Sequence, residues 1–125
     1  MDSSLYFYNE IAGIYYLQKT DYSGNIKWSK QLDLDQPSTV PVVLYDGSIV
    51  STGKEEGEFI RIAASGDTLW QCFIEVDHPL WAENCGITVG LDTAIYYITS
   101  DRHRLVVINK DGTLEWSLTD DRIYV

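Results

Sequence analysis

The heptapeptide Ala64-Ser65-Gly66-Asp67-Thr68-Leu69-Trp70 places a tryptophan four residues after a glycine, and this arrangement occurs three times in the chain. The other two copies are Tyr22-Ser23-Gly24-Asn25-Ile26-Lys27-Trp28 and Lys110-Asp111-Gly112-Thr113-Leu114-Glu115-Trp116. The copies align without a gap, and the tryptophans are 70 − 28 = 42 and 116 − 70 = 46 residues apart. The chain is therefore built from one repeating unit.

Short apolar stretches, separated by turns rich in glycine and aspartate, fill each unit. No stretch has the 3.6-residue periodicity of an amphipathic helix, so the pattern predicts an all-β fold. The expected strands fall into groups of three, four and four: 3–9, 14–20 and 26–32; 39–45, 48–52, 58–63 and 68–75; 85–91, 93–99, 105–109 and 113–118.

An all-β unit that repeats every 40–50 residues or so is typical of a β-propeller, in which four-stranded antiparallel sheets, the blades, surround an axis. The sequence predicts about three blades in a single propeller segment, residues 1–125. Their expected extents are about 3–33, about 38–76 and about 84–120.

Each glycine is expected to close the turn between the third and fourth strands of a blade, and each tryptophan to lie on the outermost strand. Strict alternation would place Trp28 on one face with Ile26 and Lys30. A large ring at this position can fill the space between neighbouring blades, and its burial contributes about 2–3 kcal/mol. The predicted structural residues of the repeat are Gly24, Trp28, Gly66, Trp70, Gly112 and Trp116.

These segments resemble the tryptophan-bearing repeats of bacterial β-propeller proteins. Lys19-Thr20-Asp21 through Trp28 resembles the Lys-x-Asp-x-x-Gly-x-x-x-Trp repeat of secreted propellers, and Asp46 to Val50 with Phe59 to Trp70 is similar also to pyrroloquinoline-quinone-type repeats. The resemblance implies an extracytoplasmic or secreted location, and that family includes both quinoprotein dehydrogenases and non-enzymatic scaffolds of the bacterial envelope. The later copies depart from the motif, with Arg61 and Val107 at the lysine position and Ala63 and Asn109 at the aspartate position.

Propellers have about 4–8 blades, more than this sequence supplies. The first group of strands matches the second to fourth strands of a blade, and residues 122–125 could start an innermost strand. We expect either a piece of a longer propeller or copies that associate to complete the ring, with two chains giving six blades.

Nine basic and nineteen acidic residues give a formal charge of −10. An acidic surface repels phosphate backbones and anionic lipids, so we expect neither nucleic-acid binding nor membrane insertion. The N-terminus lacks the basic start of a signal peptide. Cys72 and Cys85 have no metal-binding spacing, and both a disulfide and two buried thiols remain open.

No nucleophile motif, phosphate-binding loop or zinc-binding spacing occurs, so no catalytic, cofactor-binding or metal-binding residue is assigned and no cofactor is expected. The vicinal cysteine pair of quinone-dependent enzymes is missing. Asn109-Lys110-Asp111-Gly112 superficially resembles part of a calcium loop, but an ordinary turn is the preferred interpretation.

The loops between the second and third strands of each blade are expected on the same face as the connections between blades. One connection contains the candidate interaction residues His78 and Trp81, and one of these loops contains Arg102 and His103. Trp81 could anchor a partner or tuck beneath the connection, and the two histidines could meet Asp77 and Asp101 at a metal, although solvated loop residues are favoured.

We therefore expect a non-catalytic propeller module that acts as a protein-interaction or structural scaffold, with another protein or a second copy as its partner. The alternative is a fragment of a larger propeller enzyme, a quinoprotein-like oxidoreductase or a hydrolase, whose active site lies partly outside this chain.

Overall fold

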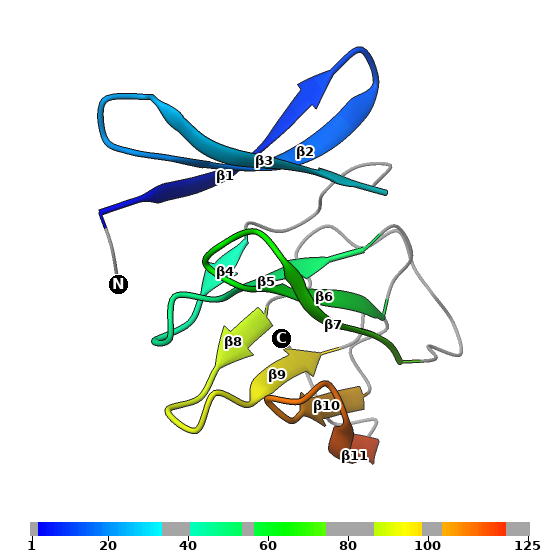
Figure 1. Ribbon diagram of the computed structural model, residues 1–125. Helices are drawn as coiled ribbons and strands as arrows, with labels where there is room; N and C mark the ends of the chain where they lie inside the picture. The colour runs from blue at the N-terminus through cyan, green and yellow to red at the C-terminus, as the bar shows by residue number, and fades with distance from the viewer. Residues whose placement is uncertain (1–2, 34–40, 54–56, 75–86, 99–103, 120–125) are drawn as a thin grey trace.

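Three antiparallel sheets make up the computed structural model, which describes residues 3–33, 41–53, 57–74, 87–98 and 104–119. The first sheet has the order β1-β2-β3, the second β4-β5-β6-β7 and the third β8-β9-β10-β11 (Figure 1). Their strands are β1 (Leu5–Ile11), β2 (Ile14–Thr20), β3 (Ile26–Leu32), β4 (Val42–Val43), β5 (Ile49–Thr52), β6 (Glu58–Ile62), β7 (Thr68–Phe73), β8 (Ile87–Val89), β9 (Ile95–Ile98), β10 (Arg104–Ile108) and β11 (Leu114–Thr119). The predicted all-β class and the grouping of three, four and four strands are confirmed.

The same glycine turn precedes the last strand of every sheet. Gly24, Gly66 and Gly112 have φ angles of +88°, +98° and +89°, which side-chain-bearing residues rarely adopt. Each glycine N–H donates to the carbonyl three residues earlier, for example from Gly66 to Ala63 at 2.9 Å. The repeated glycine therefore sets the geometry of each turn.

A β-bulge follows this turn at the same place in each sheet. Trp28 pairs with Lys19, but the next pair is Ile26 with Thr20, so Lys27 is the extra residue. Equivalent register shifts occur in the second and third sheets. The bulge interrupts the alternation expected to group Ile26 with Trp28, and Ile26 is exposed.

The second and third sheets converge at one edge, where β4 and β8 are the only described strands of different sheets whose Cα atoms come within 8 Å of one another. The strands that bear the repeated tryptophans, β3, β7 and β11, lie at the opposite edges of their sheets. The space between these two sheets is therefore widest near β7 and β11, where a larger side chain is needed to fill it.

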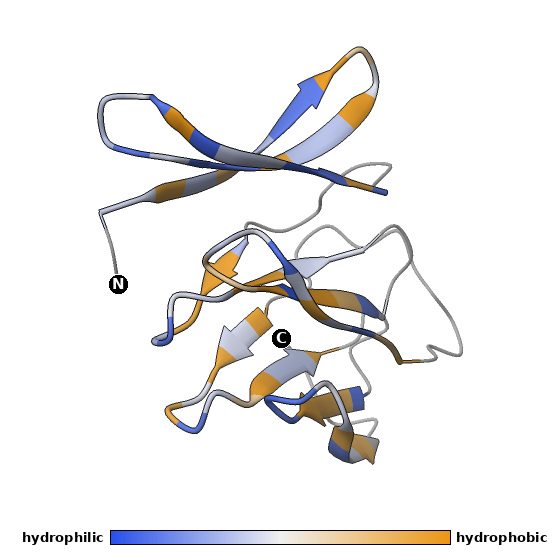
Figure 2. Ribbon diagram, in the orientation of Figure 1, coloured by the Kyte–Doolittle hydropathy of each residue, from blue (hydrophilic) through white to orange (hydrophobic). Residues whose placement is uncertain are grey.

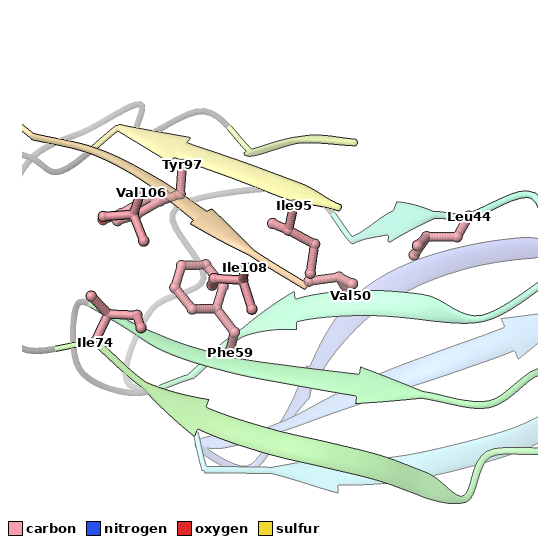
Figure 3. Packing of buried hydrophobic residues seen from close by; sticks show 8 residues of the cluster. All are labelled: Leu44, Val50, Phe59, Ile74, Ile95, Tyr97, Val106 and Ile108. Atoms are coloured by element: carbon pink, nitrogen blue, oxygen red, sulfur yellow. The ribbon is translucent and has the colours of Figure 1, made fainter. Parts of the chain in front are cut away.

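Two apolar layers separate the three sheets. The layer between the first and second sheets is built on Leu17, Leu32, Ile49 and Ile62. Eight buried residues form the layer between the second and third sheets: Leu44, Val50, Phe59, Ile74, Ile95, Tyr97, Val106 and Ile108 (Figure 3). Apolar segments recur along the strands of all three sheets (Figure 2).

Phe59 packs at the centre of the second layer, where its ring meets the Tyr97 ring edge to face at 5.0 Å. We expect Phe59→Ala to lower the free energy of unfolding by about 3–5 kcal/mol, because it leaves a cavity between two sheets. Phe73→Ala on the neighbouring strand is the matched control, since Phe73 is exposed. Urea denaturation measures both, and equal losses would contradict this assignment of the core.

Candidate functional site

The first inter-sheet contact is made by Trp28 on β3. Its indole Nε1–H donates to the Ala64 carbonyl at 2.9 Å. Its ring lies over Gly66, where a Cβ atom would come 3.2 Å from Trp28 Cδ2. The indole thus covers the glycine turn of the second sheet and satisfies a carbonyl beside that turn.

The second inter-sheet contact repeats this geometry with Trp70 on β7. Its Nε1–H donates to the Lys110 carbonyl at 2.8 Å, and a Cβ atom on Gly112 would come 2.8 Å from Trp70 Cδ2. Both carbonyls belong to the residue two positions before the turn glycine. Only a residue without a side chain leaves the ring room to approach this closely.

A basic side chain reaches the same carbonyl in both contacts. Lys19 Nζ donates to the Ala64 carbonyl at 3.0 Å, and Arg61 Nη1 donates to the Lys110 carbonyl at 2.6 Å. Each basic residue is the cross-strand partner of the tryptophan, nine positions earlier in the chain. One carbonyl oxygen with two lone pairs therefore accepts two donors from the preceding sheet.

Arg61 is held by two further partners. Its Nη2 forms an ion pair with Asp46 Oδ2 at 2.7 Å, and its Nε donates to Ser48 Oγ at 2.9 Å. Hydrogen bonds from Ser48, together with the Arg61 charge, hold the pKa of the Asp46 carboxyl below its ordinary value. The buried guanidinium is thus compensated by an anion and two neutral acceptors.

Polar contacts also extend across the first interface. Lys30 Nζ donates to the Gly66 carbonyl at 3.1 Å, and the Tyr8 hydroxyl lies 2.7 Å from Ser51 Oγ. Burial raises the pKa of the Tyr8 hydroxyl. Lys19 Nζ also lies 5.5 Å from the centroid of the Tyr6 ring, a cation–π contact.

The structure brings four of the six predicted repeat residues together as two pairs, Trp28 with Gly66 and Trp70 with Gly112. Gly24 has the same turn geometry in the first sheet, and the backbone of Trp116 pairs with Val107. The basic residues were not singled out from the sequence as contact residues, although their constant nine-residue offset from the tryptophan was a usable signal.

The candidate interaction residues His78, Trp81, Arg102 and His103 lie outside the described residues, as does Cys85. Cys72 is half-buried, and desolvation raises the pKa of its thiol to about 11. Because Cys85 is not described, a disulfide between Cys72 and Cys85 and two buried thiols both stay open as predictions.

The Asn109–Gly112 segment forms a turn. Asp111 Oδ1 accepts hydrogen bonds from the Thr113 hydroxyl and backbone N–H, which hold its carboxyl pKa below the ordinary value. Within the described ranges no group of three or more His, Cys, Asp or Glu side chains could hold a metal ion. The same ranges contain no helix long and apolar enough to cross a membrane.

Comparison with solved structures places this arrangement among known folds. A streptogramin B lyase superposes with a TM-score of 0.60 at 19% identity, covering 97% of this chain and 42% of the lyase. The fold is of the β-propeller type. Each sheet is accordingly a blade, and the tryptophan contacts join successive blades.

Two further structures are similar. One is a catalytically inactive virginiamycin B lyase from Staphylococcus aureus with quinupristin, at TM-score 0.59 and 19% identity over 96% of this chain and 42% of that one. The other is a protein of unknown function from Bacteroides caccae, at TM-score 0.50 and 14% identity over 88% of this chain and 43% of that one. The chain spans less than half the length of these structures. No protein-family model and no curated protein matches the sequence.

Replacing Trp70 separates the contribution of its ring from that of its N–H. We expect Trp70→Phe to lower the free energy of unfolding by about 1 kcal/mol, because one hydrogen bond is lost while Arg61 still donates to the Lys110 carbonyl. Trp70→Ala should cost about 3 kcal/mol because the space between blades is left unfilled. Leu69→Ala on the same strand is the exposed control. An unchanged unfolding midpoint for Trp70→Ala would rule out the packing role.

The three turn glycines share one φ value but not one environment. Nothing lies within 4 Å of a Cβ atom built on Gly24, so Gly24→Ala should cost only the strain of a left-handed backbone, about 1 kcal/mol. Gly66→Ala should cost more and Gly112→Ala most, because the methyl groups meet the Trp28 and Trp70 rings. Thermal unfolding at low protein concentration gives the order, and three equal losses would mean that the rings do not lie on the turns.

Proposed function

We propose that this chain is a non-catalytic set of propeller blades that acts as a structural or protein-binding scaffold. The observation that carries the proposal is the use of the repeated polar and aromatic side chains. Lys19, Trp28, Arg61 and Trp70 all donate to backbone carbonyls of the following blade. These side chains hold neighbouring blades together. The blades therefore form a rigid surface on which other proteins can assemble.

The contacts also support assigning the blades to the Gly-x-x-x-Trp repeat type, including its pyrroloquinoline-quinone-type relatives. Three motif positions have a physical role in the first interface: Lys19 and Trp28 as donors, and Gly66 as the surface on which the ring lies. Arg61 fills the lysine position in the second interface and makes the equivalent bond. When all motif residues of a repeat make contacts between blades, the motif identifies the architecture. The residues that bind a partner protein must then lie elsewhere in the chain.

The enzyme alternative is a propeller whose active site draws on further blades. Two of the similar structures are lyases, and this chain covers 42% of each. At 19% identity the likeness extends to the fold alone. The scaffold is preferred because it follows from contacts of this chain's own side chains.

An assay with quinupristin, the compound present in one of the lyase structures, distinguishes the scaffold proposal from the enzyme alternative. We expect quinupristin to remain intact after prolonged incubation with the purified full-length protein, followed by chromatography and mass spectrometry. A streptogramin B lyase is the positive control and buffer the negative one. Turnover that disappears in His78→Ala or His103→Ala would overturn the scaffold proposal in favour of the enzyme.

A further inference from the structure

The guanidinium of Arg61 joins two turns of the chain at the junction between the second and third blades. Arg61 is 5% exposed, and it donates to Asp46 and Ser48 between β4 and β5 and to the Lys110 carbonyl between β10 and β11. Among the residues that the structure describes, Asp46 is the one anion paired with it. The contact with the third blade is therefore made by a buried cation whose charge is balanced from its own blade.

The turn that contains Asp46 directs its carboxylate toward Arg61. The Oδ1 atom accepts hydrogen bonds from the backbone N–H and the hydroxyl of Ser48, at 2.9 Å and 2.5 Å, and Oδ2 contacts the guanidinium at 2.7 Å. The Asp46 side chain is half exposed, so it can take up a proton from water, whereas an arginine stays charged. The protonation state of Asp46 therefore decides whether the buried cation keeps its counter-ion.

The third blade contains the same turn without the arginine. Asp92 stands where Asp46 stands in the second blade, and its Oδ1 likewise accepts the backbone N–H two residues on, at 3.2 Å. The serine is replaced by Ala94 and the arginine by Val107, and both are buried. The aspartate therefore shapes the turn in both blades, and in the second blade it also balances the cross-strand cation.

Other charged side chains lie on the first blade and on the turns that meet at this junction. They are Lys19, Lys30, Asp67, Lys110 and Asp111. The two lysines of the first blade donate to carbonyls of the turn between β6 and β7, and each of the two aspartates accepts a hydrogen bond from a hydroxyl of its own turn. The Lys110 side chain is exposed. In the described contacts none of these groups replaces Asp46 as the counter-ion of Arg61.

We propose that Asp46, Ser48 and Arg61 form an acid-sensitive latch that holds the third blade against the second. When the Asp46 carboxylate takes up a proton, the guanidinium loses its counter-ion, and its buried position between the blades becomes unfavourable. Arg61 then exchanges the Lys110 carbonyl for water, and the Trp70 indole is left as the single donor to that carbonyl, through a weaker neutral hydrogen bond. The junction between the second and third blades is thereby loosened.

The direction of the pH response follows from the carboxyl group of Asp46. Hydrogen bonds from Ser48 and the charge of Arg61 hold its pKa below the ordinary value. A carboxyl whose pKa is lower in the folded state stabilises that state above the ordinary pKa, and the contribution is lost as the pH falls through the lowered pKa. The latch is therefore closed at neutral pH and opens in strongly acidic solution.

An NMR titration of the full chain from about pH 7 to about pH 3 spans the protonation of an aspartate and tests the latch. The Arg61 Nε–H and Trp70 indole N–H resonances should shift together, with one midpoint below the ordinary pKa of an aspartate. The Trp28 indole N–H is the internal reference, because its bond to the Ala64 carbonyl does not involve the latch residues. It should keep its position while the other two resonances move.

Two aspartate variants test the latch at neutral pH, where acid unfolding does not interfere. Asp46→Asn removes the counter-ion, so exchange of the Arg61 Nε–H with water should become about tenfold faster, the factor for one charge-assisted hydrogen bond. The Trp70 indole N–H should also take the position that it has in acid. Asp92→Asn is the matched control, because it removes the equivalent turn carboxylate and leaves Arg61 paired. It should titrate like the parent chain.

An Arg61 Nε–H that stays protected in Asp46→Asn would overturn the latch, since a group other than the carboxylate would then hold the arginine. Equal changes in the two variants would also overturn it, because they would trace the effect to the turns and not to the ion pair. The latch joins two blades whether the propeller is a scaffold or an enzyme. Its failure would leave the scaffold proposal standing, and quinupristin turnover would leave the latch standing.

Discussion

One backbone carbonyl beside each glycine turn governs how successive blades meet. The Ala64 and Lys110 carbonyls point at the preceding blade, where each accepts an indole N–H and a cationic N–H. A carbonyl buried without partners would cost about 1–3 kcal/mol, so the contact is favourable only when both blades are in register. The glycine at the turn matters equally, because a side chain there would displace the ring.

This constraint explains why the sheets splay. The second and third blades approach closely at β4 and β8 and carry the tryptophan strands β7 and β11 at their far edges. A flat apolar layer would fill a gap of constant width, whereas an indole at the wide edge fills a wedge. The buried layer of Phe59, Tyr97 and their neighbours then holds the middle of the interface. The tryptophan contact recurs between the first and second blades, and repeated contacts of this kind suit the radial arrangement of a propeller.

Much of the architecture was predictable from the spacing of glycine and tryptophan, because a period of this length with short strands admits few folds. The bulge was not predictable, since it depends on which backbone groups pair across the sheet, and it removes Ile26 from the face assigned by simple alternation. The role of Lys19 and Arg61 was missed because their target carbonyls lie 45 and 49 residues away. The loop residues His78, Trp81, Arg102 and His103 remain predictions from the sequence alone, because they lie outside the described residues.

The contact between ring and glycine is most directly measured by the proton chemical shifts of the three turn glycines in the monomeric protein. An aromatic ring stacked on a glycine shifts the Hα resonances upfield. The structure predicts upfield-shifted Hα protons for Gly66 and Gly112, and ordinary shifts for Gly24. Three glycines with indistinguishable, unshifted resonances would contradict the central role assigned to the indole.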